Sequence, residues 1–117
     1  MPIYTDVTLD RESFLEVLKN NTGIVILKFS AEWCTPCSRI KNVVDELVEK
    51  KVGNRSDVSF YYIDVDESFD LFAHLKSKKI VPAIPALLFY REGTVSFVPD
   101  NVYIGADTTE IMRFFNF

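Results

Sequence analysis

The sequence has 117 residues, of which 48% are hydrophobic and 26% are charged, so it can bury the core of one globular domain. Its formal net charge is −4 and it carries no basic stripe, which argues against nucleic acid or an anionic membrane as a partner. Since no apolar run is long enough to span a bilayer, we expect a single domain over residues 1–117 that works away from membranes.

The first half of the chain predicts two helices and two strands. Asp10 is a candidate N-cap for a helix that ends near residues 20–23, and residues 24–29 are apolar enough for a central strand. A second helix follows with Pro36 in its first turn, and residues 58–65 predict the next strand. The buried face of that second helix is predicted to contain Ile40, Val43, Val44, Leu47 and Val48.

The second half predicts a helix, a β-hairpin and a last helix. The segments are a helix over 68–78, a strand over 85–90, a tight turn at 91–94, a returning strand over 95–98 that can resume at 102–104, and a helix over 107–117. This order is typical of an α/β fold with a mixed central sheet flanked by helices. We expect the first half of the sheet to be parallel and the C-terminal hairpin to be antiparallel.

The two cysteines of the chain, Cys34 and Cys37, lie three positions apart where the first strand meets the second helix. Sulfur atoms at this spacing can form and break a disulfide with little backbone movement. Free N–H groups and the helix dipole favour negative charge at a helix N-terminus, so we expect the pKa of Cys34 to be lowered. Cys34 would then attack a disulfide as a thiolate, and Cys37, expected to be less exposed, would resolve the mixed disulfide.

A cysteine pair can also bind zinc, but zinc normally takes four ligands. His74 is the only histidine, and it could join the pair only in a half-site shared between two chains. Its predicted helix, rich in lysine, is more typical of a solvated surface, so we expect neither a metal nor an organic cofactor. Residues 1–6 do not resemble a signal peptide, which favours the cytoplasm, where cysteines stay reduced.

Three motifs make the sequence resemble the thioredoxin family over roughly residues 8 to 116. They are FSAEWCTPC at residues 29–37, IDVD at residues 63–66 and IPALLF at residues 84–89. The resemblance implies a thioredoxin fold and a redox-active disulfide. It also implies that the chain is a monomer that reduces disulfides of proteins and is recharged by a separate disulfide reductase.

The resemblance also implies which residues contact the substrate. Ile84-Pro85 should be a cis peptide that faces the two cysteines, leaving nearby backbone free to pair with an extended substrate. Trp33, Ile84 and Pro85 should form an apolar rim around Cys34, with Pro36 beside it.

Several residues depart from the family pattern. Thr35 stands where a glycine is usual, and Asn42 replaces a proline that commonly kinks the helix. Lys28 stands where many members carry a buried aspartate, and Tyr62 occupies the position usually paired with that acid. Three interpretations of Lys28 stay open: a neutral base toward Cys37, a charged group that favours the thiolate, or a charged group without a functional role.

The leading prediction is therefore a thioredoxin-like protein-disulfide reductase. A disulfide oxidant or isomerase is an alternative, although no histidine lies between the cysteines to stabilise the thiolate. A third hypothesis is a non-catalytic binding module or a subunit of a larger assembly. An exposed aromatic C-terminus at residues 114–117 would favour this third hypothesis.

Overall fold

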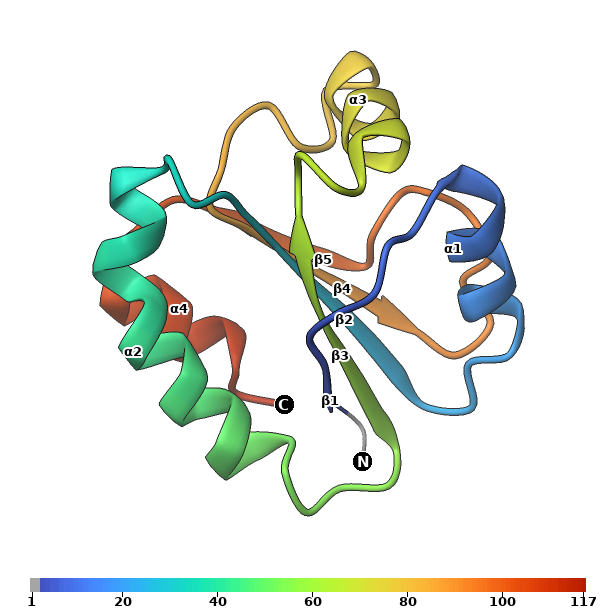
Figure 1. The fold of residues 1–117 in the computed structure, drawn as a ribbon. Helices are drawn as coiled ribbons and strands as arrows, with labels where there is room; N and C mark the ends of the chain where they lie inside the picture. Colours follow the sequence, from blue (N-terminus) through green and yellow to red (C-terminus); the bar gives the residue numbers. More distant parts are fainter. Residues whose placement is uncertain (1–2) are drawn as a thin grey trace.

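The computed structural model describes residues 3–117, which form five strands and four helices (Figure 1). In chain order these are β1 (Ile3–Tyr4), α1 (Arg11–Lys19), β2 (Ile24–Ser30), α2 (Thr35–Lys51), β3 (Val58–Asp64), α3 (Phe69–Ser77), β4 (Ala86–Arg91), β5 (Asn101–Ile104) and α4 (Thr108–Phe114). The short strand β1 was not predicted, because two residues are too few to produce a recognisable alternation.

The strands form one mixed sheet in the order β1-β3-β2-β4-β5, which confirms the predicted fold class. β1, β3 and β2 are parallel, whereas β4 runs antiparallel to β2, and β5 runs antiparallel to β4. β2 is the central strand, and its five inner residues are all buried. Its nearly continuous apolar sequence therefore reflects the helices that cover both faces.

The helices cover the two faces of the sheet in pairs, α1 and α3 on one face and α2 and α4 on the other (Figure 1). Val25, Leu27 and Phe29 of β2 belong to the core under α1 and α3. Ile26 points the opposite way, into the core under α2 and α4, as the alternation of a strand requires. Lys28 follows Ile26 at a spacing of two, so the same alternation directs it toward α2.

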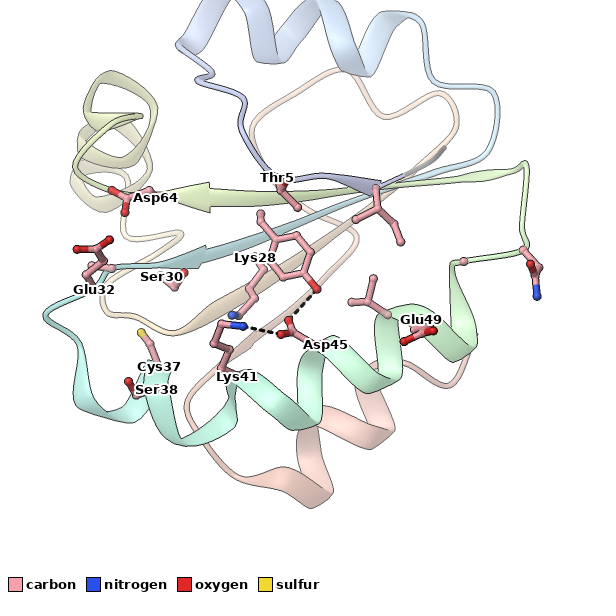
Figure 2. A pocket seen from close by; sticks show the side chains of 16 residues that line it. Thr5, Lys28, Ser30, Glu32, Cys37, Ser38, Lys41, Asp45, Glu49 and Asp64 are labelled. Atoms are coloured by element: carbon pink, nitrogen blue, oxygen red, sulfur yellow. Dashed lines mark hydrogen bonds and ion pairs between the residues drawn. The ribbon is translucent and has the colours of Figure 1, made fainter.

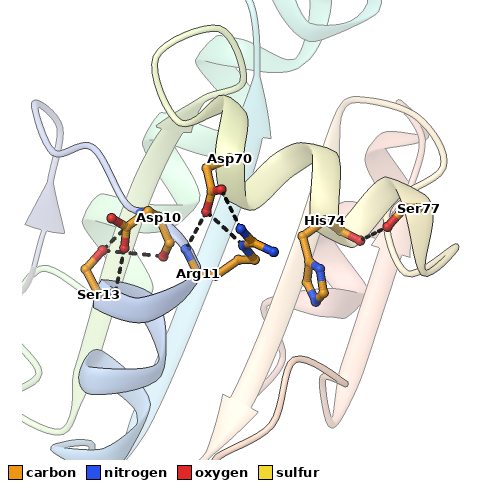
Figure 3. Close-up of polar contacts among 6 residues, drawn as sticks. All are labelled: Asp10, Arg11, Ser13, Asp70, His74 and Ser77. Atoms are coloured by element: carbon orange, nitrogen blue, oxygen red, sulfur yellow. Dashed lines mark hydrogen bonds and ion pairs between the residues drawn. The ribbon is translucent and has the colours of Figure 1, made fainter.

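Asp10 caps α1, as predicted (Figure 3). Its carboxylate accepts a hydrogen bond from the backbone N–H of Ser13 at 2.7 Å, and the Ser13 hydroxyl accepts one from the Asp10 N–H at 2.9 Å. Arg11 then joins α1 to α3, because both its backbone N–H and its guanidinium donate to Asp70. The two helices on this face are thus linked at their N-terminal ends.

The predicted strand over residues 95–98 is wrong: residues 92–100 form a loop, and β5 begins only at Asn101. The Tyr90 hydroxyl donates to the carbonyl of Phe97 at 2.7 Å, and the ring of Phe97 packs against Phe14 and His74. These contacts draw the segment inward, whereas a returning strand would continue straight along β4.

The structure corrects two further expectations, one about the exposure of His74 and one about the C-terminal segment. His74, expected to be solvated, is half-buried, with its ring 4.5 Å from that of Phe97. The last helix ends at Phe114, and Phe114 and Phe115 are buried core residues. Phe117 packs on Phe89 at 5.5 Å between ring centroids, so the aromatic C-terminus closes the core under α4.

Candidate active site

Cys34 and Cys37 form a disulfide at the N-terminus of α2. Their Cα atoms are 5.2 Å apart, as one helical turn allows. The exposed fractions of the two residues are 5% and 4%, so the predicted difference in exposure is absent in the oxidised form. Exposure therefore does not tell the attacking cysteine from the resolving one.

The position of Cys34 on the helix does distinguish the two. Cys34 is the N-cap of α2, and its sulfur accepts a hydrogen bond from the backbone N–H of Cys37 at 3.2 Å. This N–H is one of the groups that a helix N-terminus leaves without a partner inside the helix. Pro36 lies in the first turn, where its missing N–H costs nothing. After reduction, the same arrangement would favour a negative charge on Cys34.

The peptide bond Ile84–Pro85 is cis, as the family resemblance implies. The carbonyl oxygen of Ile84 lies 4.0 Å from the sulfur of Cys34, so this loop faces the disulfide. Within residues 3–117, no backbone–backbone hydrogen bond involves Ile84. Pro85 is buried, and its carbonyl accepts a bond from Gly105 N–H at 3.0 Å. A backbone edge beside the disulfide is thereby left open.

Trp33 forms the exposed rim next to Cys34, since 66% of its surface is accessible. Its indole nitrogen donates to the carboxylate of Asp66, in the loop after β3, at 2.9 Å. Pro36 and Ile84 are half-buried nearby. The residues predicted to contact substrate thus lie on the two segments that meet at the disulfide. Asp66, the last residue of the IDVD motif, is an additional site residue to which the sequence analysis gave no role.

A cavity of about 990 Å³ lies between α2 and strands β1, β3 and β2 (Figure 2). Cys37 and Lys28 both line it, from α2 and β2 respectively. On its α2 wall, the carboxylate of Asp45 accepts hydrogen bonds from Lys41 at 2.7 Å and from the Tyr62 hydroxyl at 3.0 Å. Cys37 therefore lines the same cavity as the polar side chains of Lys28, Lys41, Asp45 and Tyr62.

Lys28 is almost completely buried, with 3% of its surface exposed. Burial lowers its pKa, an effect that Asp45 opposes and Lys41 strengthens. Its ammonium nitrogen lies 5.5 Å from the centroid of the Tyr62 ring, its neighbour across the parallel β2–β3 pair.

The pKa values of Asp45 and Tyr62 are shifted in opposite directions. Burial opposes the charged form of Asp45, but the hydrogen bonds from Lys41 and Tyr62 hold its pKa below the usual carboxyl value. Burial, together with Asp45, raises the pKa of Tyr62. The Tyr62 hydroxyl therefore stays protonated and donates to a carboxylate. Asp45 was missed in the sequence, although its spacing of four from Lys41 is typical of a helical ion pair.

In the part of the chain that the structure describes, no group of three His, Cys, Asp or Glu side chains could hold a metal ion. His74, the third ligand of the zinc hypothesis, packs on Phe97 on the α1–α3 face of the sheet. No helix among residues 3–117 combines the length and apolarity that crossing a membrane requires.

Comparison with known proteins agrees with this geometry. The family model for thioredoxin matches residues 5–116. The chain is 34% identical over 76 residues to thioredoxin-2 of Saccharomyces cerevisiae, covering 65% of each chain. It is 33% identical over 98 residues to thioredoxin H2-1 of Oryza sativa subsp. japonica, covering 84% of this chain and 62% of the relative. The aligned regions thus span just under two thirds of each relative's length.

The solved structure of Trichomonas vaginalis thioredoxin is similar with a TM-score of 0.73 and 27% sequence identity. This similarity covers 97% of the present chain and 95% of the other. The chain belongs to the thioredoxin family. Its cysteine pair, which can cycle between a dithiol and a disulfide, is the part of the fold suited to thiol–disulfide exchange.

Proposed function

We propose that this protein is a thiol–disulfide oxidoreductase that reduces disulfides in protein substrates. The observation that carries the proposal is the Cys34–Cys37 disulfide at the N-terminus of α2, facing the cis peptide Ile84–Pro85. A helix N-terminus favours the thiolate form of a cysteine, and an open backbone edge beside it can bind an extended peptide that carries a disulfide.

The exchange proceeds in two displacements. The Cys34 thiolate attacks one sulfur of the substrate disulfide, forming a mixed disulfide and releasing the other substrate sulfur as a thiolate that takes up a proton. Cys37, deprotonated, then attacks the sulfur of Cys34, and the second substrate sulfur leaves and is protonated. The substrate gains two electrons and two protons, and the protein returns to its disulfide form.

Substrate binding uses the rim around Cys34. An extended substrate segment pairs with the free backbone of Ile84 and packs on the exposed Trp33 and the half-buried Pro36, while the buried Pro85 fixes the cis turn behind them. Exposed aromatic area and unpaired backbone groups recognise peptide shape more than side-chain identity. The proposed substrates are therefore disulfide-containing proteins of varied sequence.

The proposal also covers the electron source, the location and the partners of the protein. The electrons come from a separate disulfide reductase, and the exchange needs no bound cofactor because the electron pairs travel with sulfur. We place the protein in the cytoplasm as a one-domain monomer that carries reducing electrons and maintains redox balance, with neither nucleic acid nor membrane as a partner.

Reduction of insulin disulfides with dithiothreitol as the electron source tests the proposal. Wild type should accelerate the reaction, and Cys34→Ser should abolish the acceleration. Cys37→Ser should accumulate a mixed disulfide with substrate, which mass spectrometry detects. If the wild type is folded but inert, the binding-module hypothesis replaces this one.

A measured reduction potential separates a reductase from an oxidant, because about 30 mV in this two-electron couple corresponds to a tenfold change in the equilibrium constant. A value near those of disulfide oxidants would favour the oxidant or isomerase hypothesis. The buried C-terminal aromatics already remove one argument for a binding module, because Phe114 and Phe115 offer no docking surface.

A further inference from the structure

The ammonium group of Lys28 is buried without a strong partner. Among the residues that the structure describes, no ion pair reaches it, and its close contact is the ring of Tyr62. A buried cation in this situation is unfavourable, and an anion that arises beside it in another state of the protein would be stabilised by it. The position of Lys28 in the wall of the cavity limits where that anion can come from (Figure 2).

The charged groups around Lys28 leave one candidate. Asp45 faces it from α2, but the carboxylate of Asp45 is already engaged by Lys41 and by the Tyr62 hydroxyl. Cys37 lines the same cavity from the first turn of α2. The other carboxylates lining the cavity belong to Glu32, Glu49 and Asp64. Of these groups, only Cys37 changes its charge during the redox cycle.

We propose that Lys28 is a positioning residue that holds Cys37 as a thiolate while Cys34 is bonded to the substrate. The proposal deepens the redox function proposed above and rests on it. At that stage Cys34 carries no charge, so the Cys37 sulfur is the anion that the ammonium can stabilise. The proton lost by Cys37 passes to the substrate thiolate released in the first displacement. Cys37 then attacks the sulfur of Cys34, and the last substrate sulfur leaves with its electron pair.

Lys28 is better placed than Lys41 for this role. Lys28 is shielded from water, and a charge in such low-dielectric surroundings acts strongly on its neighbours. The Lys41 side chain, in contrast, is 67% exposed and pairs with Asp45. The two lysines differ in burial but share the same cavity and the same nearby carboxylate. Lys41 is therefore a matched control for a general effect of positive charge.

The test uses Cys34→Ser, in which Cys37 is the only thiol and its neighbour is uncharged, as in the mixed disulfide. Thiolate absorbance against pH gives the pKa of Cys37. Adding Lys28→Met should weaken the ionisation of Cys37 about tenfold, one pKa unit, while adding Lys41→Met should change it by less than about threefold. Equal shifts in the two variants, or no shift with Lys28→Met, would overturn the proposal.

A second measurement leaves Lys28 in place. Because the coupling between two sites is reciprocal, the Cys37 thiolate must strengthen proton binding to Lys28 by the same factor. The NMR chemical shift of the Lys28 Cε carbon, followed against pH, reports the pKa of Lys28. This pKa should be about one unit higher in Cys34→Ser than in the variant with both cysteines changed to serine. Identical titrations would overturn the proposal. Neither measurement depends on insulin reduction, so failure of the redox function would be seen separately.

Discussion

The indole nitrogen of Trp33 donates a hydrogen bond to Asp66 at 2.9 Å, so an exposed ring beside Cys34 is anchored to the loop that follows β3. An anchored ring loses less conformational entropy when a substrate packs on it than a freely rotating one would. The bond therefore orients the ring to which the proposed function assigns substrate binding.

Asp66→Ala should lower kcat/KM for insulin reduction about fivefold, the effect expected from one hydrogen bond of this kind. Glu67→Ala is the matched control, because it removes a neighbouring carboxylate that is not bonded to Trp33. Reduction of a small disulfide that does not reach the ring should be unchanged in both variants. Equal losses in the two variants would show that charge, and not the indole bond, matters.

Ser68→Ala should destabilise the fold by about 1–3 kcal/mol, because it leaves a buried donor without an acceptor. Ser68 is 1% exposed, and its hydroxyl accepts the backbone N–H of Leu9 at 3.0 Å, across 59 positions of sequence. Urea unfolding measures the change. The control is Ser77→Ala, which removes an exposed hydroxyl from the last residue of α3, the helix that begins just after Ser68. This substitution should cost much less. Equal costs for the two serines would contradict this account.

Lys28→Met should raise the stability of the oxidised protein by about 1 kcal/mol near neutral pH, since methionine fills the site without a buried charge. The pKa of Lys28 is lower in the folded than in the unfolded protein, so protonation favours unfolding. Wild-type stability therefore recovers relative to the variant as pH rises from the folded pKa toward 10.5, and the difference shrinks.

Urea midpoints of the two proteins between pH 7 and about 10.5 measure this difference. Lys41→Met, which removes an exposed lysine, should bring no gain. A stability difference for Lys28→Met that grows with pH would contradict the assigned burial of a charged lysine.

Phe115→Ala should cost about 3–5 kcal/mol, because the ring is completely buried and its loss leaves a cavity against Phe60. Met112→Ala, within α4 and three residues before Phe115, is the control, since Met112 is 58% exposed, and its cost should be within about 0.5 kcal/mol. Thermal or urea unfolding distinguishes them. A negligible cost for Phe115→Ala would restore the C-terminal aromatics as a docking surface.

Periodicity and local chemistry predicted most of the fold. The capping residue Asp10 and the apolar run of β2 act over short distances along the chain, so sequence patterns indicate them directly. The residues 92–100 could not be predicted in this way. Their path depends on the Tyr90 hydroxyl and the Phe97 ring, whose partners lie on other elements.

In the candidate site, too, the features specified by short motifs were predicted and the long-range contacts were not. The cysteine pair and the cis peptide were expected because a short motif specifies each. The contacts of Asp45 and Asp66 were not predicted, although Asp66 belongs to the IDVD motif, because a carboxylate on a helix or in a loop is usually solvated. Only the folded chain brings these two residues to Tyr62 and Trp33.

Gly93 lies at the opposite end of the sheet from the cysteines. It follows the end of β4, where Arg91 pairs with Ile24, whereas Cys34 comes after the far end of β2. A side chain placed at Gly93 would meet open space, although its φ of +92° favours glycine itself. A tether inserted in this turn would fix the molecule to a support with its reactive sulfurs pointing outward, ready to capture mixed-disulfide partners from solution.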